Sequence, residues 1–249
     1  MRENALDDFT RNGYSVVRGL CARAARERLL AIAREHLAAA VPPLEYEADV
    51  QYPGSPPSRD APGGRTVRRL LQAYVRDPAY AKWATSPQVK ACLTPLLGRE
   101  IELSQAHHNC VMTKDPRYSS LTSWHRDIRY WAFERTDLVS VWLALGRETK
   151  ENGCLLVLPG SHDIEFEPGR LDEAQFLRTD AEANQSLLAS AVAVELEPGD
   201  VLFFHARLFH AAGRNRTTDT KYSVVFTYHA AGNHPIPGSR SAALPDIAF

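Results

Sequence analysis

Residues Trp124-His125-Arg126-Asp127 (WHRD) place a histidine and an aspartate two positions apart, within a region rich in strand-forming residues. On an extended strand the side-chain period is two, so His125 and Asp127 face one side and Arg126 faces the other. An imidazole and a carboxylate held side by side supply two corners of the facial triad that non-haem iron(II) oxygenases use. Alone the pair is weak evidence, because a chain with nine histidines contains such pairs by chance.

The segments around WHRD favour a mainly β architecture. Short runs of β-type residues are separated by turn signals such as KDPRY, KENG and EPGD, which is typical of a sandwich or barrel and not of alternating βαβ units. The expected strands cover 101–104, 108–113, 138–145, 154–158, 192–196, 201–205 and 222–228. A polar stretch over 166–190 reads as a partly helical insertion between two of them.

The N-terminal part of the chain has helical spacing instead. Residues 3–12, 22–41 and 78–97 carry apolar side chains at helical intervals, and 14–17 reads as a short strand between the first two. Residues 42–64 are rich in Pro, Gly and Ser, which predicts a loop or lid with no core of its own. We therefore expect a single domain over 1–249, with a helical part over about 1–98 and a barrel over about 99–232.

Composition narrows the classes of function and location. The chain has 29 Lys and Arg against 30 Asp and Glu, so no global field attracts nucleic acid or an anionic membrane. No stretch approaches the roughly 20 apolar residues that span a bilayer, the first residues lack the core of a secretory signal, and the four cysteines are scattered. We expect a cytoplasmic protein that acts on a small molecule; its oligomeric state is not predicted.

Three further motifs follow WHRD in order: NGCLLVLPGSH at 152–162, PGDVLFFH at 198–205 and FHAAGRNR at 209–216. With these motifs the chain resembles the phytanoyl-CoA dioxygenase family from about Phe9 to Tyr228. The resemblance implies a double-stranded β-helix, a jelly-roll barrel of the cupin type, flanked by helices. It also implies that ferrous iron binds in the mouth of that barrel.

By the same resemblance the iron ligands are His125, Asp127 and His210. His205 is the rival for the third ligand, but His210 directly precedes the small-residue turn and the Asn-Arg pair of the family pattern. The resemblance further implies 2-oxoglutarate and O₂ as co-substrates, which the three positions left open by a facial triad would accommodate.

Two residues are alternatives for one contact to 2-oxoglutarate. Family members usually carry an arginine eleven residues after the distal histidine, where this chain has Lys221, a point charge in place of a bidentate fork. Either Lys221 or Arg216, from the Asn-Arg turn, takes that role. The resemblance adds Thr122, Ser140 and His108 as further contacts to the co-substrate.

The resemblance implies that the enzyme hydroxylates an unactivated C–H bond of a small metabolite and releases succinate and CO₂. The alternative is a cupin-like metal-binding isomerase, or a non-catalytic small-molecule binding protein, on the same barrel. We expect a substrate with an anionic handle, admitted beneath a lid over 43–66. The arginines that suggest this handle are Arg59, Arg65, Arg68, Arg69 and Arg129.

Overall fold

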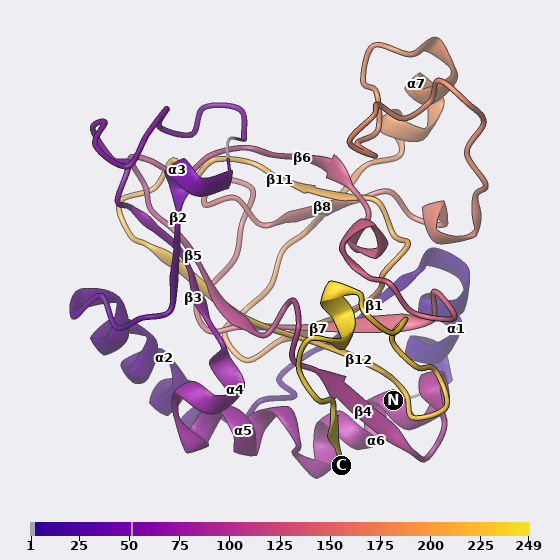
Figure 1. Cartoon of the computed structure of the whole chain (residues 1–249), viewed down its shortest axis with the longest axis horizontal. Coiled ribbons are helices and arrows are strands. Elements are labelled where there is room, and N and C mark those ends of the chain that lie inside the picture. The colour runs from indigo at the N-terminus through magenta and orange to yellow at the C-terminus, as the bar shows by residue number, and fades with distance from the viewer. Residues whose placement is uncertain (1–2, 51) are drawn as a thin grey trace.

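The computed structural model describes residues 3–50 and 52–249, and two antiparallel sheets face each other in it (Figure 1). Within these residues the larger sheet has nine strands and the smaller has four. The larger sheet contains β1 (Tyr14–Val17), β2 (Leu44–Tyr46), β3 (Val67–Leu71), β4 (Ile101–Ser104), β5 (Cys110–Lys114), β7 (Leu138–Ala144), β10 (Val201–His205), β12 (Lys221–Ala230) and β13 (Ile247–Ala248). The smaller sheet contains β6 (Thr122–His125), β8 (Leu155–Val157), β9 (Val192–Val194) and β11 (His210–Ala212).

Strand order follows the long non-local pairings of a jelly roll. The larger sheet runs β1-β10-β7-β12-β5-β3-β2, with β4 beside β12 and β13 beside β4, and the smaller runs β6-β11-β8-β9. All of these pairings are antiparallel. The predicted fold class, a mainly β jelly-roll barrel with flanking helices, is confirmed.

Alternation along the central strands separates two apolar layers. In β7, Val141 and Leu143 pack under the helices, whereas Trp142 between them packs inside the barrel. Phe203 and Phe204 of β10 divide in the same way. Both faces of this sheet are therefore buried, which is why its strands read as near-continuous apolar runs.

Helices cover the outer face of the larger sheet, as Figure 1 shows for α2, α5 and α6. The buried Tyr80 of α5 donates its hydroxyl to the Leu29 carbonyl at 3.0 Å, and Tyr228 of β12 donates to the Ala84 carbonyl at 2.9 Å. No helix in the described part of the chain combines the length and apolarity needed to cross a membrane. The helices are α1 (Glu3–Asn12), α2 (Arg23–Ala38), α3 (Glu47–Val50), α4 (Ala73–Arg76), α5 (Pro78–Ala84), α6 (Pro87–Leu97) and α7 (Glu182–Ala189).

The helical segment expected over 78–97 is two helices in the structure. Asp77 caps α5 by accepting the Ala79 N–H at 2.8 Å, and Ser86 accepts from Val89 at the start of α6. Pro87 then occupies the first turn, where its missing N–H costs nothing. These capping residues restart the helix, although the apolar spacing continues across the break.

The segment expected to be a loop over 42–64 is partly ordered, and this expectation is corrected. It contains β2 and α3, and β2 pairs with the unpredicted strand β3. The two adjacent arginines of β3, Arg68 and Arg69, hid its strand pattern, yet Leu70 between β2 and β5 is completely buried. The region predicted to be helical thus contributes three strands, β1, β2 and β3, to the larger sheet.

The expected extended conformation of WHRD ends one residue early. β6 stops at His125, and Asp127 begins a short 3-10 helix that runs to Tyr130. Because Arg126 between them remains extended, His125 and Asp127 still face the same side. Arg126 points away and stacks on Phe209 and Phe166, at 5.1 and 5.3 Å from the ring centroids.

Candidate metal centre and its two pockets

Three predicted ligands meet where the paired strands β6 and β11 of the smaller sheet have their common end. His125 ends β6, His210 begins β11, and the two are cross-strand partners with ring centroids 4.2 Å apart. Asp127 reaches the same point from the start of the 3-10 helix, and one ligand atom from each residue lies within 4.8 Å of the others. All three side chains are buried. The structure therefore brings together the residues that the sequence predicted.

Backbone carbonyls fix the orientation of both rings. His125 Nδ1 lies 2.8 Å from the Ser123 carbonyl oxygen, and His210 Nδ1 lies 3.1 Å from that of Leu208. Because a carbonyl only accepts, each Nδ1 carries a proton, and the Nε2 atom of each ring is turned toward Asp127 Oδ1, at 3.6 and 3.4 Å. The two Nε2 atoms and the carboxylate oxygen thus converge on one point, where either a proton or a metal cation would bind between them.

The charges of these groups are tightly coupled. Burial lowers the pKa of His125, with the neighbouring His210 acting in the same direction. Burial opposes charge on Asp127 as well, but His108 and His210 outweigh it and hold the pKa of Asp127 well below its usual range. Burial likewise opposes charge on His210, whose pKa is nevertheless raised by the Asp127 carboxylate. A metal ion would displace the proton that this carboxylate attracts.

Two of the predicted co-substrate contacts lie against Asp127. Ser140 Oγ is 3.5 Å from Asp127 Oδ2 and 3.0 Å from Thr227 Oγ1. His108 Nδ1 is 3.4 Å from the same carboxylate oxygen, and burial lowers the pKa of His108 to about 4. The backbone of His108, in the bend between β4 and β5, has a φ of 34°, a conformation that costs a non-glycine residue free energy.

Two rival residues lie elsewhere. The Nδ1 atom of His205 accepts the backbone N–H of Arg207 at 3.0 Å, and its ring faces Phe9, so it does not join the cluster. Arg216 lines a surface depression on the outside of the barrel, where its backbone N–H donates to the Glu151 carbonyl. The structure therefore brings His210, and not His205, to the triad. Arg216 does not line the cavity that lies beside the triad.

An inner cavity beside the triad is lined by the predicted Lys221 and Thr122. The Nζ atom of Lys221 is 3.0 Å from Glu148 Oε2, and the Thr122 hydroxyl accepts a hydrogen bond from Arg68 Nη2 at 3.0 Å. Sequence reasoning missed Lys114, a third buried cation of this cavity, and Glu148. Arg68 was expected to help bind the substrate's anionic handle, whereas its side chain is buried against this inner cavity.

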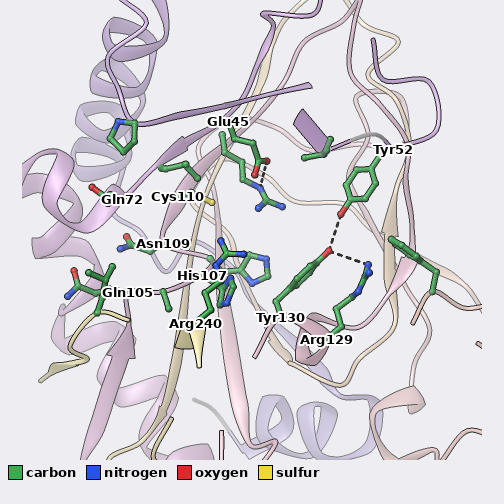
Figure 2. Close-up of a pocket in the computed structure, with 18 residues that line it drawn as sticks. Glu45, Tyr52, Gln72, Gln105, His107, Asn109, Cys110, Arg129, Tyr130 and Arg240 are labelled. Atoms are coloured by element: carbon green, nitrogen blue, oxygen red, sulfur yellow. Dashed lines mark hydrogen bonds and ion pairs between the residues drawn. The ribbon is translucent and has the colours of Figure 1, made fainter. Parts of the chain in front are cut away.

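A larger pocket of about 660 Å³ shares His108 with the inner cavity, and Figure 2 shows the residues that line it. Its size is that of a typical small-molecule site. The hydroxyls of Tyr52 and Tyr130 meet at 3.0 Å across it, and Arg129 lies over the rings of Tyr130 and Phe176, at 5.0 and 4.1 Å. Tyr52 comes from the segment predicted to be a lid and Phe176 from the insertion, so both segments help to form this pocket.

The predicted arginine cluster is only partly assembled there. Arg59 and Arg65 do not line either pocket, because they pair with Asp49 at 2.7 Å and Asp60 at 3.3 Å. Their expected place at the barrel mouth is corrected accordingly. Arg240, from the C-terminal segment, lines the large pocket and was missed.

Comparison with known proteins identifies the family. The model of the phytanoyl-CoA dioxygenase (PhyH) family matches residues 9–223, which include the whole triad and Lys221. The chain belongs to the phytanoyl-CoA dioxygenase family. A probable phytanoyl-CoA dioxygenase from Caenorhabditis elegans is 29% identical over 176 residues, which cover 66% of this chain and 55% of that protein. The chain spans about half the length of the curated relatives it matches.

Solved structures of related proteins share the fold. The non-haem α-ketoglutarate-dependent epimerase SnoN from nogalamycin biosynthesis superposes with a TM-score of 0.75 at 24% identity, over 97% of this chain and 87% of that one. EctD from S. alaskensis, solved with 2-oxoglutarate and 5-hydroxyectoine, gives 0.75 at 21% identity, over 94% and 78%. These likenesses establish the jelly-roll architecture of this family member.

Removing any triad residue should abolish tight metal binding. We expect His125→Ala, Asp127→Ala and His210→Ala each to weaken Fe(II) binding by more than the roughly 10- to 100-fold typical of residues that only support a ligand. His205→Ala is the matched control and should bind one equivalent. Anaerobic equilibrium dialysis followed by metal analysis measures both. Loss of metal from His205→Ala, or its retention in the triad variants, would overturn the ligand assignment.

Proposed function

We propose that this chain is an Fe(II)- and 2-oxoglutarate-dependent dioxygenase that hydroxylates a small metabolite with an anionic handle. The observation that carries the proposal is the convergence of His125, Asp127 and His210 at a cation-lined inner cavity, which shares His108 with a large outer pocket. Two histidines and one carboxylate are the ligand set of non-haem iron(II) oxygenases, which leaves coordination positions for substrates. Membership of the phytanoyl-CoA dioxygenase family supports the same reaction class.

The ligands of the triad suit a resident ferrous ion. When bound, iron would supply oxygen activation coupled to the decarboxylation of 2-oxoglutarate, which releases succinate and CO₂. The protein's contribution is to hold the three ligands through Ser123, Leu208 and Ser140, and to keep bulk water away from a buried centre. No side chain has to act as a general acid or base.

The co-substrate fits the inner cavity in this proposal. Its 2-oxo acid end would lie toward the triad, beside His108, and its distal carboxylate would lie toward Lys221. Thr122, held by Arg68, offers its hydroxyl along the way. Arg216 is a poor candidate for the anchor, because it lines a different depression.

The outer pocket suits the primary substrate. Three arginines line it (Arg69, Arg129 and Arg240) against a single acidic side chain, Glu45, which already pairs with Arg69 at 3.3 Å. Within the described residues Arg129 has no carboxylate at ion-pair distance, and its guanidinium stacks on Phe176. A carboxylate or phosphate on the substrate would supply the missing charge through forked hydrogen bonds.

Turnover should produce succinate in an oxygen-dependent way. Anaerobic Fe(II)-loaded protein is mixed with 2-oxoglutarate and members of a metabolite panel, oxygen is admitted, and succinate and product masses are recorded. We expect a matching compound to stimulate succinate formation and to gain one oxygen atom. A product of unchanged mass without succinate would favour the isomerase alternative, and binding without any product would favour the binding protein.

Neutralising Arg129 should selectively weaken the binding of an anionic substrate. For the compound that the panel identifies, Arg129→Gln should raise KM on the order of 10- to 100-fold, because the charge-assisted hydrogen bond is lost. The affinity for 2-oxoglutarate should stay unchanged, since Arg129 lines the outer pocket only. Arg65→Gln is the matched control. An unchanged KM in Arg129→Gln, or equal turnover of an uncharged amide of the substrate, would reject the anionic handle.

A further inference from the structure

Two buried lysines stand directly opposite each other in the inner cavity. Lys114 ends β5, Lys221 begins β12, and the two are register partners in the antiparallel pair. Each is 7% exposed, and both line the cavity beside the triad. Like charges in directly opposed positions destabilise a sheet, so this arrangement calls for compensating negative charge.

Lys221 has its compensation within the protein. Its Nζ atom is 3.0 Å from Glu148 Oε2 and 3.2 Å from Ser223 Oγ. The other oxygen of Glu148 accepts hydrogen bonds from Trp142 Nε1 at 3.0 Å and from Ser223 Oγ at 2.6 Å. This ion pair is complete before any ligand arrives, so Lys221 brings no net charge to the cavity.

Lys114 has no such partner. Its Nζ atom donates to the Ser120 carbonyl at 2.9 Å, and no carboxylate of the described residues lies within ion-pair distance of it. The nearby Glu47 is engaged by Arg68 at 3.4 Å and by the Ser120 hydroxyl at 2.7 Å. Arg69, which also lines the cavity, pairs with Glu45 at 3.3 Å, so among the described residues here, the triad aside, Lys114 is the cation without an acidic partner.

The charge on Lys114 is costly as it stands. Burial lowers the pKa of Lys114 to about 7, with the cations Arg68, Lys221 and Arg214 acting in the same direction and Glu47 opposing them. A buried charge without a partner is unfavourable, and a ligand carboxylate placed beside it would recover that free energy. The stem of Lys114 also packs where a side chain on Gly153 would collide, 2.8 Å from its Cδ and Cε atoms. The absence of a side chain at Gly153 therefore leaves room for the Lys114 stem.

We propose that Lys114 supplies the uncompensated positive charge that binds the distal carboxylate of 2-oxoglutarate, while Lys221 acts as a hydrogen-bond donor neutralised by Glu148. This inference rests on the proposed function, since it concerns the co-substrate of that reaction. It predicts that Lys114 sets the preference for a dicarboxylate over a 2-oxo acid that lacks the distal carboxylate. A purely structural lysine would have no such effect on ligand choice.

The test compares two ligands that differ only at the far end. Binding of 2-oxoglutarate and 2-oxopentanoate to the anaerobic Fe(II)-loaded chain is measured by calorimetry. We expect the wild type to bind 2-oxoglutarate more tightly than 2-oxopentanoate. Lys114→Met should lower the affinity for 2-oxoglutarate on the order of 100-fold and change the affinity for 2-oxopentanoate little. Lys150→Met, a matched change at an exposed lysine, should leave both affinities unchanged.

The pH profile gives a second readout. Only the protonated ammonium binds a carboxylate, so wild-type affinity for 2-oxoglutarate should fall as pH rises above the pKa of Lys114, whereas Lys114→Arg should stay flat because arginine remains charged. If Lys114→Met does not fold, the pH profiles of the wild type and Lys114→Arg still test whether Lys114 binds the distal carboxylate.

Different results would reject the proposed function and the role of Lys114. Binding of neither ligand to the metal-loaded wild type would reject the proposed function. Undiminished preference for 2-oxoglutarate in Lys114→Met, or a flat wild-type pH profile, would reject the role of Lys114 and leave the reaction class intact.

Discussion

The Asp127 carboxylate, buried between two imidazole nitrogens, is the contact on which the remaining features depend. Its Oδ1 atom faces the Nε2 atoms of His125 and His210, and its Oδ2 atom faces His108 and Ser140. A buried carboxylate in such surroundings is unfavourable without a cation. Elements from both sheets converge to surround this one group, so the two-sheet barrel provides the rigid frame that a metal centre requires.

Charge is distributed unequally around that centre. In the inner cavity one buried cation, Lys114, lacks an acidic partner among the described residues. In the outer pocket the arginines outnumber the single glutamate. In the proposed function each side therefore matches an anion of its own, 2-oxoglutarate in the inner cavity and the substrate's anionic handle in the outer pocket. Because the overall charge of the chain is close to zero, recognition has to come from these local excesses and not from a long-range field.

Periodicity predicted a mainly β sandwich or barrel, and the family resemblance implied the jelly roll and the triad, but long-range register lay beyond both. The alternation that turns Cys110 and Met112 inward also turns Lys114 inward. That Lys114 faces Lys221 depends on how β5 pairs with β12, which no local pattern fixes. Arg240 comes from a C-terminal segment without periodicity, so only the tertiary structure could bring it to the outer pocket.

The most direct test of the metal centre is anomalous diffraction at the iron edge. Crystals would be grown anaerobically with Fe(II) and 2-oxoglutarate. We predict one strong peak at bonding distance from His125 Nε2, His210 Nε2 and an Asp127 carboxylate oxygen, with co-substrate density running toward Lys114. A peak at Glu102, His229 and Asp246, a second group among the described residues that could hold a metal, with none at the triad, would contradict the account.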